Sequence, residues 1–207
     1  MLDSALRARL APSLDSVAGR LETAGVRPAA VTAVGLAIGV AACVAAALGV
    51  WHVALAAWLV NRTLDGLDGP LARRVGATDF GGILDFVADF VVYGGFVVAV
   101  AIAVPDARIA CSALLAAYLL NNVAQLSFAS LIEKRRLAFG DERSLRLTPG
   151  LTEGTETILA YAAFCLVPDQ ARWVAWIFTA MVLFTVGQRL VMARRVLDGG
   201  DAAPTLG

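Results

Sequence analysis

Charged side chains are scarce in this chain of 207 residues: only 16% are Asp, Glu, Lys or Arg, against roughly 25% in soluble domains. The basic and acidic residues also balance at 17 each, so no net charge is available to attract nucleic acid. These features exclude a disordered chain, a nucleic-acid-binding protein and most soluble enzymes. With 59% hydrophobic residues and a mean hydropathy of +0.74, the composition indicates a polytopic membrane protein.

Cysteine and histidine are rare as well. Cys43, Cys111 and Cys165 lie far apart in apolar runs, with neither metal-ligand spacing nor a disulfide framework, so we interpret them as small core residues. The single histidine, His52, is expected at the membrane face opposite the acidic residues described below. Neither residue type therefore supplies a candidate metal site.

Long apolar segments predict an all-α integral membrane protein with six transmembrane helices, each of about 20 residues. The run between Arg27 and Arg62 has 34 residues without a charge, too many for one helix, and a break at residues 49–52 divides it. The predicted spans are about 29–50, 53–74, 80–104, 109–132, 155–167 and 173–196. We therefore divide the chain into a juxtamembrane segment (1–28), a six-helix domain (29–198) and a disordered tail (199–207).

Basic residues set the expected orientation. With six spans, fifteen of the Lys and Arg residues, Arg62 included, fall at one membrane side and only Arg108 and Arg172 at the other. Because cytoplasmic loops are enriched in Lys and Arg, we expect both termini in the cytoplasm, most simply of a bacterial cytoplasmic membrane. The first 28 residues carry charges throughout, so no cleavable signal peptide is expected.

The juxtamembrane segment has an amphipathic pattern. Leu10, Leu14, Val17 and Leu21 recur at helical spacing, and we expect a helix lying on the cytoplasmic membrane surface. Pro12 is expected in its first turn, where the missing N–H has little cost.

Four aspartates mark the cytoplasmic ends of the second and third spans. Asp65 and Asp68 are three residues apart, and Asp85 and Asp89 are four apart. Ionisable groups inside membrane helices are costly and usually line a polar cavity or bind something. Carboxylate oxygens are the ligands that hard divalent cations prefer, so we expect Mg²⁺ or Mn²⁺ between the two pairs.

Helical spacing extends both carboxylate faces. Gly69, Ala72 and Arg73 share the face of Asp65 and Asp68, which combines metal ligands with small residues and a phosphate-binding guanidinium. On the third span, Gly81 shares the face of the second aspartate pair, whereas Asp79 is interpreted as a helix N-cap. With only a short loop at 75–78 between them, the two faces predict a metal–diphosphate site at the membrane surface.

This pattern resembles the CDP-alcohol phosphotransferases, integral-membrane enzymes of phospholipid synthesis. Their motif is D-x2-D-G-x2-A-R followed by G-x3-D-x3-D, and every motif residue is present, although the spacer of seven residues is one shorter than is common. The matching residues are Asp65, Asp68, Gly69, Ala72, Arg73, Gly81, Asp85 and Asp89.

The resemblance implies a reaction and residue roles. The four aspartates would hold one or two Mg²⁺ or Mn²⁺ ions, Asp89 would also act as general base, and Gly69, Ala72 and Arg73 would line the CDP site. An alcohol would attack the lipid-bearing phosphorus of a CDP-linked donor such as CDP-diacylglycerol and release CMP. Family members are commonly homodimers.

The acceptor is expected to be a small polar alcohol bound near the same metals. Lys134 and Arg189 are candidate contacts, and such cations would favour glycerol 3-phosphate or inositol phosphate over serine or choline. Lys134 could instead be a positive-inside anchor. The polar run at 150–157 could shape the acceptor site, although Thr152 is better interpreted as a helix cap.

Three other functions fit part of the pattern. Intramembrane aromatic prenyltransferases bind diphosphate through N-x3-D-x2-D, present here at Asn61, but they are longer and carry their second aspartate motif far along the chain. A divalent-cation transporter could use the same carboxylates, yet this does not account for Gly69, Ala72 and Arg73. A regulator that only binds its ligand is the third alternative.

Overall fold

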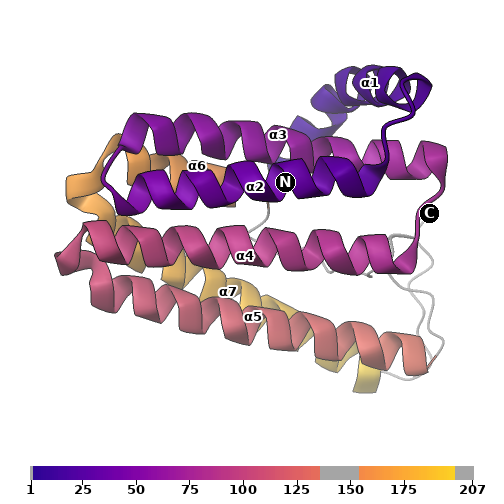
Figure 1. Cartoon of the computed structure of the whole chain (residues 1–207). Coiled ribbons are helices and arrows are strands. Elements are labelled where there is room, and N and C mark those ends of the chain that lie inside the picture. Colours follow the sequence, from indigo (N-terminus) through magenta and orange to yellow (C-terminus); the bar gives the residue numbers. More distant parts are fainter. Residues whose placement is uncertain (1, 136–153, 199–207) are drawn as a thin grey trace.

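Helices account for all the regular structure in the described residues, 2–135 and 154–198, of this computed structural model (Figure 1). The predicted break after the first span is a turn at Gly49, where φ is +73°. The elements are α1 Leu2–Thr23, α2 Pro28–Ala47, α3 Trp51–Val75, α4 Asp79–Ala103, η1 Pro105–Ala107, α5 Arg108–Lys134, α6 Gly154–Leu166, η2 Pro168–Gln170 and α7 Ala171–Asp198. The all-α prediction is confirmed, and α2 to α7 match the six predicted segments to within a few residues.

The bundle has an aromatic core between its two halves. Helix α2 packs against α3 and α4, whereas α5 packs against α7, and α6 contacts both α3 and α7 (Figure 1). Trp58 of α3 is fully buried and stacks on Tyr161 of α6, with ring centroids 4.5 Å apart. The Tyr161 hydroxyl donates to the Tyr93 carbonyl at 2.9 Å. Side chains of α3, α4 and α6 meet in this core, and α2 packs against both α3 and α4.

Within residues 2–135 and 154–198, four helical segments are long and apolar enough to cross a membrane by length and composition: α2, α4, η1–α5 and η2–α7. Helix α3 fails because its second half carries several charged residues, and α6 fails because it has only 13 residues. The prediction of six membrane crossings is therefore not confirmed. Large apolar side chains such as Ile109, Leu119 and Ile177 point outward, as expected of helices that face lipid.

Helix α1 packs on the end of α3. Leu14, Ala18 and Leu21 face Leu67 and Leu71 of α3, so part of the apolar stripe expected on the membrane surface packs against the bundle. Val17 is exposed, so the buried face is rotated from the predicted stripe.

Polar contacts reinforce this packing. Arg74 of α3 forms ion pairs with Asp15 and Glu22 of α1.

Pro12 lies well inside α1 and not in its first turn, because the helix begins at Leu2. Residues 150–153, Thr152 among them, and the predicted tail at 199–207 lie outside the described residues.

Candidate metal and catalytic site

A short connection brings the two acidic helix faces together. Helix α3 ends at Val75, Gly76 adopts φ +106°, and α4 begins at Asp79. Thr78 caps α4 by accepting a hydrogen bond from the Gly81 N–H at 3.1 Å. The expectation that Asp79 is the N-cap is therefore wrong by one residue: the shorter Thr78 hydroxyl performs that role, and Asp79 occupies the first turn.

The Gly81 position has a local structural reason. A Cβ there would lie 2.9 Å from the Thr78 Oγ1, so a side chain would displace the capping hydroxyl. Glycine at the start of the G-x3-D-x3-D pattern thus keeps the first turn of α4 intact, and that turn orients the two aspartates that follow.

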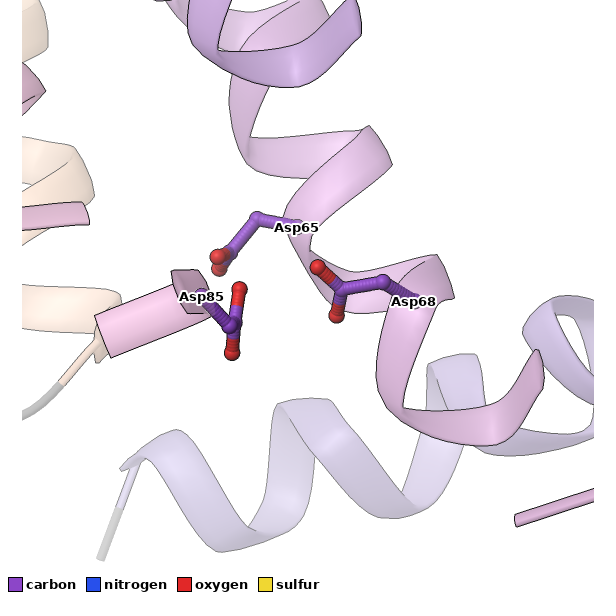
Figure 2. Close-up of side chains that lie close together, drawn as sticks. All are labelled: Asp65, Asp68 and Asp85. Atoms are coloured by element: carbon purple, nitrogen blue, oxygen red, sulfur yellow. The ribbon is translucent and has the colours of Figure 1, made fainter. Parts of the chain in front are cut away.

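Three aspartates form a group that we call the carboxylate cluster: Asp65 and Asp68 of α3 and Asp85 of α4. One oxygen from each lies within 4.8 Å of the other two. Figure 2 shows the three carboxylates turned toward one another across the gap between the helices. A divalent ion bound at about 2.1–2.4 Å from each oxygen would fit among atoms at such separations. The cluster therefore has the ligand chemistry and the spacing of a Mg²⁺ or Mn²⁺ site.

Helix α2 completes the wall of this site. Residues of three helices border a small, open pocket. They are the carboxylate cluster, Asn61, Ala88 and Asp89, and from α2 Val31, Thr32, Gly35 and Leu36. The Thr32 hydroxyl lies 3.3 Å from Asp68 Oδ2 and 3.2 Å from the Pro28 carbonyl oxygen, and its one hydrogen can be donated to either. Sequence reasoning missed this contact, although Thr32 is the only hydroxyl residue in the otherwise apolar α2.

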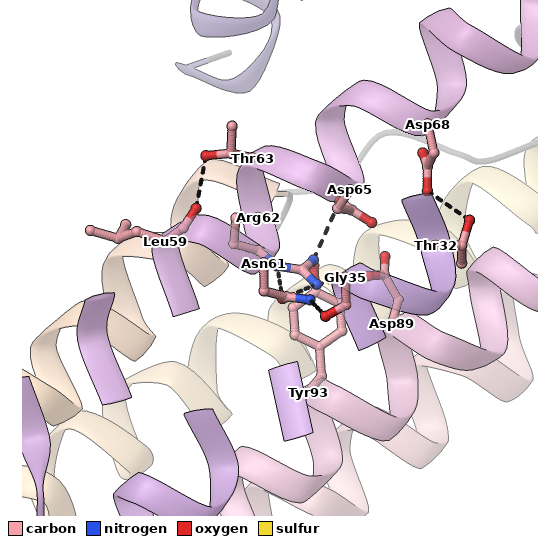
Figure 3. Close-up of polar contacts among 10 residues, drawn as sticks. All are labelled: Thr32, Gly35, Leu59, Asn61, Arg62, Thr63, Asp65, Asp68, Asp89 and Tyr93. Atoms are coloured by element: carbon pink, nitrogen blue, oxygen red, sulfur yellow. Dashed lines mark hydrogen bonds and ion pairs between the residues drawn. The ribbon is translucent and has the colours of Figure 1, made fainter. Parts of the chain in front are cut away.

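Asp89 borders the same pocket as the carboxylate cluster and is paired with Arg62. The Arg62 Nη2 donates to Asp89 Oδ1 at 2.9 Å, and its Nη1 reaches Asp65 Oδ2 at 3.4 Å (Figure 3). Only 5% of the Arg62 side chain is exposed. Arg62 therefore lies on the inner face of α3, where its side chain contacts α4.

Aromatic and amide groups surround this guanidinium. Its central carbon lies 4.8 Å from the Trp58 ring centroid and 4.7 Å from that of Tyr93. The Asn61 Oδ1 accepts from Arg62, while the Asn61 Nδ2 donates to the Gly35 carbonyl of α2 at 2.8 Å. Sequence reasoning did not identify Arg62 as a site residue, although its position three residues before Asp65 puts both on one helix face.

The predicted nucleotide-binding residues follow the cluster along α3. Arg73 is exposed, Gly69 and Ala72 are half-buried, and a Cβ on Gly69 would lie 3.5 Å from Arg73 Nη1. None of the three lines the pocket. They form a continuation of the site, with a solvent-accessible guanidinium beside a position that lacks a side chain.

The predicted acceptor contacts do not border the pocket either. Lys134 is exposed at the end of α5. Arg189 of α7 is buried, and its Nη1 donates to Asn121 Oδ1 of α5 at 2.6 Å. This bond neutralises none of the charge of Arg189 but gives its guanidinium a polar partner inside the bundle.

Comparisons with known proteins agree with the motif. The family model described as CDP-alcohol phosphatidyltransferase matches residues 26–187. The inner membrane protein YnjF of Escherichia coli (strain K12) is 40% identical over 193 residues, which cover 92% of this chain and 94% of YnjF.

Solved structures show the same fold. The phosphatidylinositol phosphate synthase PgsA1 of Mycobacterium tuberculosis with CDP-DAG bound superposes with a TM-score of 0.69 at 20% identity, covering 87% of this chain and 93% of that one. Its complex with manganese and citrate gives a TM-score of 0.69 at 21% identity, covering 87% and 88%.

Proposed function

The chain belongs to the CDP-alcohol phosphatidyltransferase family, and from that premise we propose that it transfers a phosphatidyl group from CDP-diacylglycerol to an alcohol. The observation that carries the proposal is the carboxylate cluster, which lies on the two helices that bear the family's aspartate pattern. The family match also favours this activity over the prenyltransferase, cation-transporter and binding-only alternatives. PgsA1, which shares the fold, has been solved with CDP-DAG, and this supports the choice of donor.

Asp65, Asp68 and Asp85 would hold a Mg²⁺ or Mn²⁺ ion. When bound, such an ion neutralises charge on the donor diphosphate and makes its phosphorus more electrophilic. PgsA1, which shares the fold, has been solved in complex with manganese, and this supports a divalent ion here. Thr32 would orient the Asp68 carboxylate through its hydrogen bond.

Asp89 would act as the general base. It would accept the proton of the acceptor hydroxyl as the hydroxyl oxygen forms a bond to the lipid-bearing phosphorus and the bond to CMP breaks. Because Arg62 takes one carboxylate oxygen, the other remains to receive the proton. A positioned base typically contributes about 10²–10⁴ to the rate.

The CDP moiety would lie along α3 beyond the carboxylate cluster. Gly69 and Ala72 would let the nucleotide approach the backbone, and the exposed Arg73 would pair with phosphate oxygens. The acceptor would be a phosphorylated polyol, glycerol 3-phosphate or inositol phosphate, with Lys134 and Arg189 on the cytoplasmic side as its candidate contacts. We also propose that the protein is a homodimer, as is common in the family.

All six helices from α2 to α7 would cross the bilayer, with the site and both termini facing the cytoplasm. Helix α3 has 25 residues, and at about 1.5 Å per residue it is long enough to span roughly 30 Å of hydrocarbon. Its charged residues are at the end next to α1, where the bundle would meet water.

The test is transfer by the purified protein. It is incubated with CDP-diacylglycerol, Mn²⁺ and, in turn, glycerol 3-phosphate, inositol phosphate, inositol and serine, while CMP release is measured. We expect CMP release with a phosphorylated acceptor and none with Asp85→Asn. CMP release with inositol or serine but with neither phosphorylated acceptor would refute the acceptor assignment. No CMP release with any of the four acceptors would refute the donor assignment.

A further inference from the structure

We propose that Arg62 is a positioning residue for the transfer reaction: it holds one carboxylate oxygen of Asp89, so that the other is presented to the acceptor hydroxyl. The inference rests on the proposed function, because it concerns the base of that reaction. Its basis is a buried cation on α3 that reaches across to α4 and pairs there with Asp89. Arg62 itself stands outside the family's aspartate pattern, which begins at Asp65.

The backbone of α4 does not by itself orient the Asp89 carboxylate. The last torsion of an aspartate side chain is broad and roughly two-fold, so the direction of the two oxygens stays open until something binds one of them. The Asp89 side chain is 26% exposed and borders the same pocket as the carboxylate cluster. A hydrogen bond to one oxygen from a fixed donor therefore decides which way the other oxygen points.

Arg62 is such a donor, because each of its five N–H hydrogens has an acceptor. Nε and one Nη2 hydrogen are donated to Asn61 Oδ1 at 2.9 and 2.6 Å, and the other Nη2 hydrogen is donated to Asp89 Oδ1 at 2.9 Å. The Nη1 group donates to Tyr93 Oη at 2.5 Å and to Asp65 Oδ2 at 3.4 Å. The guanidinium is planar and its donors form a rigid fork, so these bonds together define a single orientation.

The surroundings prevent the guanidinium from moving aside. The rings of Trp58 and Tyr93 lie against it, and cation–π attraction adds to the packing. Asn61 is itself tied to the α2 backbone through the carbonyl of Gly35. Arg62 is therefore held from α2, α3 and α4 together, and the direction of its bond to α4 is set by all three helices (Figure 3).

This role depends on the shape of the guanidinium as well as on its charge. Lysine keeps the charge but carries it as a single point on a flexible stem, and it cannot reproduce the fork. Arg62→Lys should therefore lower kcat by about 10–100-fold, the usual effect of releasing a group that orients a site residue. Arg74→Gln is the matched control, since Arg74 lies on the same helix but pairs with α1, and its kcat should stay at the wild-type value.

The experiment is a double-mutant cycle measured by CMP release, with kcat expressed per folded protein from thermal unfolding curves. If Arg62 acts through Asp89, its substitution should no longer matter once the base has been removed. The kcat of Arg62→Lys/Asp89→Asn should then lie within about threefold of that of Asp89→Asn alone. A merely structural role would instead lower the kcat of the double variant by the full effect of Arg62→Lys once more.

A wild-type kcat in Arg62→Lys would overturn the inference, as would a multiplied loss in the double variant. If Arg62→Lys fails to fold, Tyr93→Phe decides, because it removes one acceptor of the guanidinium and keeps the ring. Its kcat should fall, and that fall should disappear in the Asp89→Asn background; an unchanged kcat would count against Arg62. No CMP release by the wild type would refute the transfer reaction and this inference together, whereas wild-type release that Arg62→Lys retains in full would refute this inference alone.

Discussion

Asp89→Asn is expected to separate the chemical step from binding and folding. The substituted amide has the shape of the carboxylate, and its oxygen can still accept the 2.9 Å hydrogen bond from Arg62 Nη2. Exchanging a charge-assisted hydrogen bond for a neutral one costs about 1 kcal/mol of unfolding free energy. For a protein of this size, that corresponds to a fall in Tm of roughly 2–4 °C.

The effect on turnover should be much larger. An amide cannot accept the hydroxyl proton, so kcat should fall by about 10²–10⁴, equivalent to about 3–5 kcal/mol of transition-state stabilisation. Because Asp89 lies outside the carboxylate cluster, the KM for CDP-diacylglycerol should change by no more than about threefold, well under 1.4 kcal/mol of binding.

The assay is steady-state CMP release with CDP-diacylglycerol varied at saturating Mn²⁺, beside a thermal unfolding curve. Asp79→Asn is the matched control, since Asp79 is an exposed aspartate in the first turn of the same helix. A kcat for Asp89→Asn within tenfold of the wild-type value would refute Asp89 as the base. A large rise in KM with kcat unchanged would instead assign it to substrate binding.

Three further predictions address packing, pH and metal. A Cβ at Gly39 would lie 2.9 Å from Asn61 Nδ2, so Gly39→Ala should lower the unfolding free energy by about 1–3 kcal/mol in denaturation measurements. Gly187 has open space around it, so Gly187→Ala should leave the unfolding free energy unchanged. The hydrogen bond from Arg74 lowers the pKa of Asp15 below its usual 3.8. Helix α1 should therefore stay docked on α3 above pH 3.8 and loosen as the pH falls through the lowered pKa. The loosening should be measured as faster amide exchange in residues 9–23, and Asp15→Asn should abolish this response to pH. Mn²⁺ at 100 times its Kd should stabilise the fold by about 2.7 kcal/mol in thermal unfolding, and no shift at any concentration would contradict an ion in the carboxylate cluster.

The helix boundaries could be predicted because the chain marks them locally. Gly49 supplies the positive φ of the α2–α3 turn, and Pro28, Pro105 and Pro168 stand at the first positions of helical elements. Such signals act over a few residues and need no knowledge of the tertiary structure. Whether a helix crosses the bilayer depends on what surrounds it, and for the polar α3 the sequence alone does not answer that question.

The carboxylate cluster could also be predicted, since the spacing of Asp65 and Asp68 puts them on one helix face and the short loop keeps the start of α4 near that face. The contribution of α2 could not. Thr32 reaches Asp68 across a helix pair, and which face of α2 meets α3 is decided by the close approach at Gly35 and Gly39. That approach depends on packing between helices and leaves no periodic signal around the aspartates.

Arg62 shows why charge alone cannot separate topology from function in a membrane protein. A cation at the end of an apolar run satisfies the positive-inside pattern whether it faces headgroups or the protein interior. The distinction lies in the rest of its helix face: Trp58 is four residues before Arg62 and Asp65 is three after, so an aromatic ring, a guanidinium and a carboxylate are stacked on one side of α3. A cation flanked in this way has partners for its charge within its own helix, and such a cation should be counted as a site residue before it is counted as a topology signal.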